Sequence, residues 1–218
     1  MHINRWLGTV VLGLTPLAGA HAATVYWTDW TSASGSLVSG SLTTPDGVVG
    51  VTASGPFGAT QTSGGTNYWS PNTPYLSADV SNAPPASDII QLAAGGTETI
   101  SFSQAVVDPL IALVSWNGNT VTFSAPIEIL SYGAGYWGNG TPVLNPAGDG
   151  FYGNGEVHGV VRLKGTFTSL SFTHTSESWH GFTVGITQAV PEPNALWLAL
   201  AALPVVGWRY RPQRRTVA

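Results

Sequence analysis

Two carboxylates and three histidines in the second half of the chain are the residues best suited to chemistry. Glu156 and Glu177 form a candidate acid/base pair, because glycoside hydrolysis needs only two suitably spaced carboxylates. His158, His174 and His180 could assist as proton carriers. An acid-rich chain produces such pairs freely, and no Gly-x-Ser-x-Gly elbow, phosphate loop or His-Glu-x-x-His motif accompanies them. We therefore expect no catalytic residue and a non-enzymatic protein.

Metal and cofactor sites are also not predicted. His174 and His180 are six positions apart across an expected turn, which does not make a metal triad. Asp149 with Asn145 is the weakest of candidates for calcium, because a tight calcium site usually has several acidic ligands. The chain has no cysteine, which excludes disulfides, a thiol nucleophile and Cys-ligated metals. We expect neither a metal nor a cofactor.

A glycine-rich segment at residues 133–155 carries several aromatic residues. Tyr136 and Trp137 lie in it between glycines that permit unusual backbone angles, and Trp179 lies in a later polar turn. Aromatic faces of this kind stack on sugars, so these three residues are the candidate glycan-binding residues. The alternative is that the loop aromatics close one end of a hydrophobic core, since Trp and Tyr are heavily buried on average. Both interpretations stay open at the level of sequence.

The elements that must position these residues are β-strands. Short segments alternate apolar and polar residues, with turn residues roughly every ten positions, which predicts an all-β fold. The ten strands predicted in this way favour a single β-sandwich of jelly-roll type over a closed barrel. Asn117-Gly118 and Lys164-Gly165 predict two tight hairpins. Residues 57–91 and 133–155 are expected to be long excursions with few strands. The predicted strands are residues 24–30, 36–43, 48–54, 97–103, 109–116, 120–124, 127–132, 157–164, 166–173 and 181–187.

The charge of the chain is unevenly distributed. Of seven basic residues, Arg5 and four C-terminal arginines lie near the ends, so only Arg162 and Lys164 remain in residues 24–188. Ten of the eleven acidic residues lie in that body, and two minus ten leaves a net charge of −8. Such a surface repels phosphate backbones and anionic lipids. We therefore expect no nucleic-acid partner, and a body of about 165 residues is long enough for one packed domain.

Three different pieces follow one another at the C-terminus. Residues 190–193 read Val-Pro-Glu-Pro, and two prolines in three positions exclude a helix interior or a central strand. Residues 195–208 contain no charge and favour a helix of about 21 Å, which is a marginal membrane span. An arginine cluster at residues 209–215 then follows the apolar segment, as a cytoplasmic stop-transfer signal would. Its members are Arg209, Arg211, Arg214 and Arg215.

These residues resemble the PEP-CTERM sorting signal of Gram-negative bacteria. The resemblance implies that Pro191, Glu192 and Pro193 form the recognition motif of an exosortase, a membrane-embedded processing protease. It also implies a transient stay in the inner membrane, followed by release or transfer to the cell surface or the extracellular matrix. Pro204 within the apolar segment and the three residues after Arg215 are mild departures from the pattern. The hydrophobic tail would thus be a temporary transmembrane anchor.

The N-terminus predicts the same secreted route. A weakly basic start, an apolar segment and Ala20-His21-Ala22 indicate a signal peptide over residues 1–22. The domain organisation is then a signal peptide, a β-sandwich domain at residues 23–188 and a sorting signal at residues 189–218. Segments around Trp30, Trp137 and Trp179 resemble, more weakly, uncharacterised PEP-CTERM β-proteins. That resemblance implies no catalytic residue.

Three hypotheses about function follow. The favoured one is a non-enzymatic exported protein of the cell surface or exopolysaccharide matrix, with the exosortase as its processing partner. The alternative is a carbohydrate-binding module that recognises exopolysaccharide through Tyr136, Trp137 and Trp179. The third is a glycosidase, which requires Glu156 and Glu177 to converge in one cleft.

Overall fold

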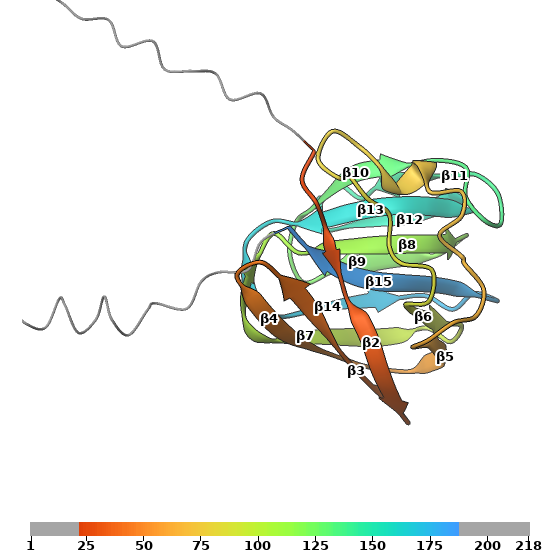
Figure 1. Cartoon of the computed structure of the whole chain (residues 1–218). Coiled ribbons are helices and arrows are strands. Elements are labelled where there is room, and N and C mark those ends of the chain that lie inside the picture. Colours follow the sequence, from red (N-terminus) through yellow and green to blue (C-terminus); the bar gives the residue numbers. More distant parts are fainter. Residues whose placement is uncertain (1–21, 188–218) are drawn as a thin grey trace, which may run out of the picture.

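A computed structural model describes residues 22–187, which form fifteen strands and one short 3-10 helix (Figure 1). The strands build two antiparallel sheets that pack face to face, so the described residues form an all-β sandwich, as predicted. Sandwich packing follows from the alternating patterns, because each sheet must bury one apolar face.

The first sheet has seven strands. Its order is β10 (Ile127–Tyr132), β13 (Val157–Leu163), β8 (Leu110–Trp116), β15 (His180–Ile186), β6 (Ile89–Leu92) and β5 (Phe57–Gln61), with β1 (Tyr26–Trp27) also paired to β15. The second sheet has eight strands. Its order is β11 (Gly140–Leu144), β12 (Gly150–Gly155), β9 (Thr120–Phe123), β14 (Thr166–His174), β7 (Gly96–Val107), β4 (Gly47–Ser54), β3 (Leu37–Thr44) and β2 (Asp29–Ser34).

The main hydrophobic core lies between the two sheets. Trp30 and Trp116 are fully buried there. Trp30 Nε1 of β2 donates across the core to Thr183 Oγ1 of β15 at 3.0 Å, whereas Trp116 Nε1 donates within the seven-stranded sheet to the Gly181 carbonyl at 2.9 Å. These bonds satisfy donors that would otherwise be buried at a cost. The core thus fixes the relative position of the sheets, including the loops at their ends.

A second layer covers the outer face of the seven-stranded sheet. The segment between β5 and β6, which carries the 3-10 helix η1 (Thr73–Tyr75), packs there with Trp69 and Tyr75 against Ala112 and Val160 (Figure 1). Every residue of β8 and β15 is therefore buried, because both faces of these strands are covered. Continuous apolar strands are expected where a sheet has no solvent-exposed face.

All ten predicted strand segments are confirmed, with residues 24–30 divided between β1 and β2. The two long excursions were predicted to have few strands, and this was only partly right. β5 and β6 lie at the ends of the first excursion, and β11 and β12 lie inside the second, where they pair from Gly140↔Gly155 to Leu144↔Phe151. Glycine and proline lower the strand propensity of these segments, but pairing with an existing sheet edge compensates for it.

Both predicted hairpins are wrong. Asn117-Gly118 connects β8 in one sheet to β9 in the other, and Lys164-Gly165 likewise connects β13 to β14. Gly118 and Gly165 do adopt positive φ angles of 70° and 137°, as a sharp reversal requires. Local turn chemistry therefore predicted the reversal of the chain. The next strand lies in the other sheet because both edges of β8 are paired with β13 and β15, and both edges of β13 with β10 and β8.

The predicted terminal signals fall almost entirely outside the described residues. These are the signal peptide at 1–22, of which only Ala22 is described, and the sorting signal at 189–218. Within residues 22–187, no helix is long and apolar enough to cross a membrane.

Candidate functional site

Four aromatic side chains from three separate segments meet at one surface, which we call the aromatic patch. It consists of Tyr68, Tyr136, Trp137 and Trp179. The ring centroids form a closed circuit: Tyr136 to Trp137 at 4.9 Å, Trp137 to Trp179 at 6.2 Å, Trp179 to Tyr68 at 4.7 Å, and Tyr68 to Tyr136 at 5.1 Å. Tyr136 is 41% exposed and Trp137 is 54% exposed, whereas Tyr68 and Trp179 are half-buried. The three predicted glycan-binding residues are thus brought together with part of their surface in solvent.

A tight glycine turn presents the two most exposed rings. The Gly135 amide donates to the Gly138 carbonyl at 2.8 Å, which closes a tight bend with Tyr136 and Trp137, both partly exposed, at its centre. Gly138 has a φ of 147°, and a Cβ on Gly135 would collide with the imidazole of His158. Glycine is therefore required at both ends of this turn, and the turn rests directly on the core.

The half-buried members of the patch are held from behind. The Trp179 indole Nε1 donates to Gln91 Oε1 at 2.9 Å, and the rings of Tyr68 and Trp179 pack against the core layer outside the seven-stranded sheet. This support fixes the ring planes of Tyr68 and Trp179. A fixed aromatic surface binds with little loss of side-chain entropy.

A pocket of about 260 Å³ adjoins the patch, and we call it the carboxylate pocket. Trp137 and Trp179 form its aromatic wall, and Glu156 and Glu177 supply its charge. Its lining residues are Ser115, Trp137, Glu156, Glu177, Ser178 and Trp179. The glycosidase hypothesis required the two glutamates to converge, and they do so in this pocket.

Glu156 is held by two donors. The Ser115 hydroxyl donates to Glu156 Oε2, and the Asn117 side-chain amide donates to Oε1 at 2.8 Å. Ser115 has a φ of 59°, in the left-handed region that residues other than glycine seldom adopt. The register between β8 and β13 shifts at this point, which marks a β-bulge that turns the Ser115 hydroxyl toward the pocket. Bulges of this kind commonly redirect side chains at functional sites.

Glu177 lies deeper and is less well supported by donors. Its Oε2 accepts the Asn117 backbone N–H at 3.3 Å, and its side chain is 15% exposed. The pKa of Glu177 is raised to about 7, chiefly by burial; the Asn117 bond opposes this shift, and the neighbouring Glu156 adds to it. The pocket therefore holds one carboxylate fixed by hydrogen bonds and one that titrates near neutral pH.

A line of buried polar side chains runs from Glu177 into the core. His180 Nδ1 lies 3.4 Å from Glu177 Oε2 without hydrogen-bond geometry, His180 Nε2 lies 3.0 Å from His174 Nδ1, and His174 Nε2 lies 3.4 Å from Glu98 Oε1. The pKa of His180 is lowered to about 3, chiefly by burial and in smaller part by His174. His180 is therefore neutral at physiological pH and supplies no positive charge to the pocket.

The remaining residues predicted for chemistry lie elsewhere. His158 is fully buried, with Nδ1 3.4 Å from the Tyr75 hydroxyl, and burial lowers its pKa to about 4. Asn145 and Asp149 bond to each other, with Asn145 Nδ2 donating to Asp149 Oδ1 at 2.7 Å. Within residues 22–187, no three His, Cys, Asp or Glu side chains lie close enough together to hold a metal ion.

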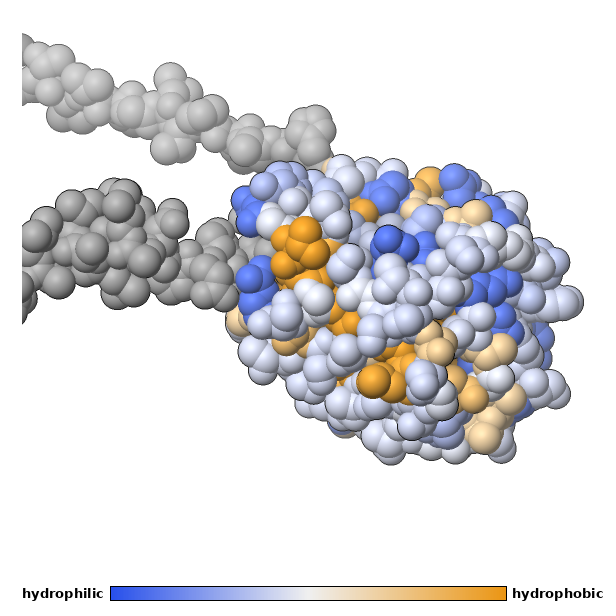
Figure 2. Space-filling view, turned by 60° about the horizontal axis from the view of Figure 1, so that its bottom comes forward, coloured by the Kyte–Doolittle hydropathy of each residue, from blue (hydrophilic) through white to orange (hydrophobic). Residues whose placement is uncertain are grey.

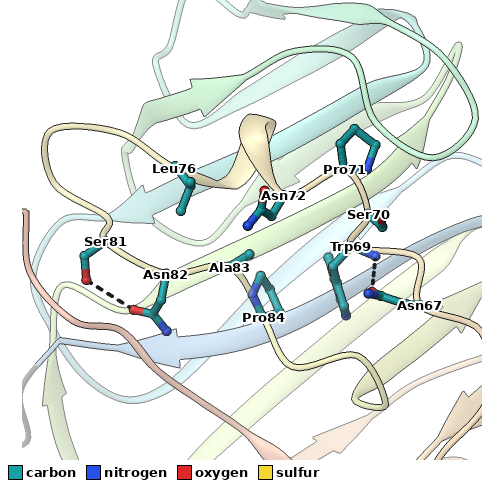
Figure 3. A pocket seen from close by; sticks show the side chains of 10 residues that line it. All are labelled: Asn67, Trp69, Ser70, Pro71, Asn72, Leu76, Ser81, Asn82, Ala83 and Pro84. Atoms are coloured by element: carbon teal, nitrogen blue, oxygen red, sulfur yellow. Dashed lines mark hydrogen bonds between the residues drawn. The ribbon is translucent and has the colours of Figure 1, made fainter.

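A larger cavity of about 700 Å³ lies on the layer outside the seven-stranded sheet (Figure 3). The segment that carries η1 forms one wall and residues 81–84 form the other, with Asn72 and Leu76 pointing toward Ala83. Its one aromatic residue, Trp69, is only 2% exposed, and its lining has no charged side chain. The full lining is Asn67, Trp69, Ser70, Pro71, Asn72, Leu76, Ser81, Asn82, Ala83 and Pro84.

The surface in Figure 2 is mostly polar, and its apolar side chains gather in small separate patches. Isolated apolar patches are normal on a soluble surface and need no partner to explain them.

Three site residues were missed from the sequence. Tyr68 lies in the first excursion, and Ser115 and Asn117 lie at the end of β8. A weak signal existed for Tyr68, because Tyr68-Trp69 and Tyr136-Trp137 are both Tyr-Trp pairs in glycine- and asparagine-rich surroundings. No sequence signal marks Ser115, since its role depends on a bulge that pairing creates.

Comparisons with known proteins found little. No protein-family model matches the chain, and no curated protein matches it. One solved structure is similar, the CBM32 of AlyQ in complex with 4,5-unsaturated mannuronic acid. The match covers 45% of this chain and 76% of that chain, with 16% identity and a TM-score of 0.21. A likeness at this TM-score carries no argument about the ligand of this protein.

Proposed function

We propose that this β-sandwich binds carbohydrate, without cleaving it, through the aromatic patch and the adjoining carboxylate pocket. The observation that carries the proposal is the convergence of Tyr68, Tyr136, Trp137 and Trp179 from three segments onto one partly exposed surface. Aromatic residues that only fill a core would be buried, and Trp137 is 54% exposed.

The arrangement matches the physical demands of sugar recognition. A pyranose ring offers a C–H face that packs on an indole, and hydroxyls around its edge that need hydrogen-bond partners. Trp137 and Trp179 supply ring faces, and Glu156, Glu177 and Ser178 line the adjoining pocket with polar groups. A few polar groups beside an apolar surface fix the orientation of a small ligand.

A glycan array tests the proposal directly. The full-length chain is purified in a detergent without a sugar headgroup and applied beside a Trp137→Ala variant. We expect binding to at least one bacterial exopolysaccharide and its loss in the variant. If no glycan binds, or if binding is the same in the variant, the proposal is wrong.

Export is the second part of the proposed function. The chain would leave the cytoplasm through its signal peptide, be processed by an exosortase at Pro191, Glu192 and Pro193, and reside at the cell surface or in the extracellular matrix. Support comes from the order of the motif, the apolar segment and the arginine cluster. A reporter fused to residues 190–218 should be processed only in cells that contain the exosortase. Equal processing without the enzyme would contradict this route.

Glycoside hydrolysis is a second candidate function, and one observation favours it. Glu156 is held by two donors while burial raises the pKa of Glu177 to about 7, so the pair has the divided character of a base or nucleophile and an acid. Reducing-end assays on any glycan found by the array separate the candidates. We expect no release of product; steady release that is lost in Glu177→Gln would establish the hydrolase instead.

A further inference from the structure

The ligand class can be narrowed by the charges around the site, and this inference rests on the proposed carbohydrate binding. Among residues 22–187, the only lysine or arginine side chains are Arg162 and Lys164. Both bond to Glu128 Oε2, at 2.7 Å and 3.1 Å. Arg162 lies near the end of β13, about 20 Å along the strand from Glu156, which precedes its start. An anionic sugar would therefore find no cation at the pocket.

The pocket instead has the composition of a cation site. Glu156 and Glu177 face it together, and each interacts with Asn117, Glu156 with the side-chain amide and Glu177 with the backbone N–H. A carboxylate has about four lone-pair positions. The donors present occupy two positions on Glu156 and one on Glu177, so acceptor capacity remains on both. An ammonium group, with three N–H donors, can use that capacity.

Two further observations point to a bound cation beside an aromatic surface. His180 is fully buried and directs Nδ1 toward Glu177 Oε2 at 3.4 Å, yet makes no hydrogen bond with that atom. The indoles of Trp137 and Trp179 line the same pocket, and Trp is the aromatic residue that attracts cations most strongly. Two carboxylates in one pocket repel each other, and a cation between them removes that cost.

We infer that the carboxylate pocket is the subsite for a cationic amino sugar, a hexosamine unit whose amine is free rather than acetylated. The sugar ring lies on the aromatic patch, and its ammonium group donates to Glu156 and Glu177 while lying against the indole of Trp137 or Trp179. The ligand would accordingly be a partly or fully de-N-acetylated polysaccharide. Neutral N-acetylated sugars would bind through the rings alone, and uronates would be repelled.

Calorimetric titration near neutral pH tests the inference with three oligosaccharides of equal length. The probes are a glucosamine oligomer, its fully N-acetylated counterpart and an oligomannuronate, each titrated into the full-length chain. We expect the glucosamine oligomer to bind at least about tenfold more tightly than the acetylated one, from the added charge-assisted and cation–π contacts. The oligomannuronate should bind more weakly than both. Glu177→Gln and Glu156→Gln should each reduce the tenfold preference toward one.

Controls separate the outcomes. Asp46→Asn, on an exposed turn, removes one negative charge elsewhere and should keep the preference. Near-ultraviolet circular dichroism checks that each variant is folded, and the two glutamate variants serve as replacements for each other if one fails. Equal binding of the amino and acetylated oligomers, or a preference that persists in both glutamate variants, would overturn the inference and leave carbohydrate binding intact. If no glycan binds at all, both proposals fail.

Discussion

The larger cavity and the carboxylate pocket differ in size, in charge and in the exposure of their indoles. The larger cavity has about 700 Å³, but its lining is uncharged and its one indole, Trp69, is buried. The carboxylate pocket has about 260 Å³, yet it joins two carboxylates to the partly exposed indoles of Trp137 and Trp179. Function is better indicated by which chemical groups reach the surface than by the size of a hollow.

The two regions also differ in what holds them. The larger cavity lies between segments that cover the seven-stranded sheet, and Trp69 and Tyr75 pack edge to face there at 5.3 Å to complete that cover. The carboxylate pocket lies where Gly135, Gly138 and Ser115 adopt or require unusual backbone arrangements. Such arrangements cost free energy and persist where a function depends on them. We therefore assign the first region a role in stability and propose the second as the binding site.

The largest expected effect is the difference between Trp69 and Trp137 in their contribution to the free energy of unfolding. Trp69→Ala removes a buried indole from the outer layer and should lower the free energy of unfolding by about 3–5 kcal/mol. Trp137→Ala removes a mostly exposed side chain and should change it by less than about 0.5 kcal/mol. Denaturant unfolding of both variants measures this. If the two losses are equal, the division of roles is wrong.

Binding should show the opposite order. Trp137→Ala should weaken binding of any glycan identified by the array by about 2 kcal/mol, or roughly thirtyfold, as expected for a central aromatic contact. Asn72→Ala, in the larger cavity, is the matched control and should leave the affinity unchanged. Calorimetric titration gives both values. An effect of Asn72→Ala as large as that of Trp137→Ala would move the binding site to the larger cavity.

The glycine turn links binding to the core. Gly135→Ala places a Cβ against the buried ring of His158, so either the ring or the turn must move. We expect a loss of stability of about 1–3 kcal/mol together with weaker glycan binding. Gly35→Ala, in the turn between β2 and β3, is the comparison: Gly35 has a φ of 58° with open space around it, and the substitution should lower stability without affecting binding. Unchanged binding in Gly135→Ala would show that the turn does not need to be held by the core.

The smallest effect concerns pH. Because the pKa of Glu177 is raised from 4.5 to about 7, its contribution to stability is present below pH 4.5 and is lost as the pH rises through 7. Glu177→Gln lacks that loss, so it should gain stability relative to the wild type as the pH rises, by under about 1 kcal/mol after solvent screening. His158 and His180 have pKa values lowered from 6.5, so their contributions to stability change only below that pH, and the comparison is made above it. Unfolding measured on both sides of pH 7 gives the difference; a constant difference would mean that Glu177 is not desolvated.

The fold was largely predictable from the sequence, because burial patterns repeat along each strand. Most of the predicted strands follow from period-two alternation, whereas β8, β13 and β15 are short segments buried on both faces and bounded by turn residues. The hairpins at Gly118 and Gly165 were not predictable, since a positive φ is common to turns within a sheet and turns between sheets. The strands β11 and β12 were missed because their glycines hide a pairing that only the neighbouring sheet stabilises.

The site was predictable only in part. Tyr136, Trp137 and Trp179 could be selected because aromatic residues among glycines are unusual, but the sequence could not choose between a core role and a surface role. That choice depends on the turn closed by Gly135 and Gly138. The convergence of Glu156 and Glu177, twenty-one positions apart, depends on β13 and β15 both pairing antiparallel with β8, which places the starts of both strands beside the end of β8 and which no local pattern encodes.

The most direct test of the account follows the indole N–H signals by nuclear magnetic resonance during a glycan titration. The signals of Trp69, Trp137 and Trp179 are assigned from single Trp→Phe variants of the full-length chain. The account predicts that the Trp137 and Trp179 signals shift in a saturable way while the Trp69 signal stays in place. A shift of Trp69 alone, or no shift of Trp137 and Trp179 with a glycan that binds, would contradict the assignment of carbohydrate binding to the aromatic patch.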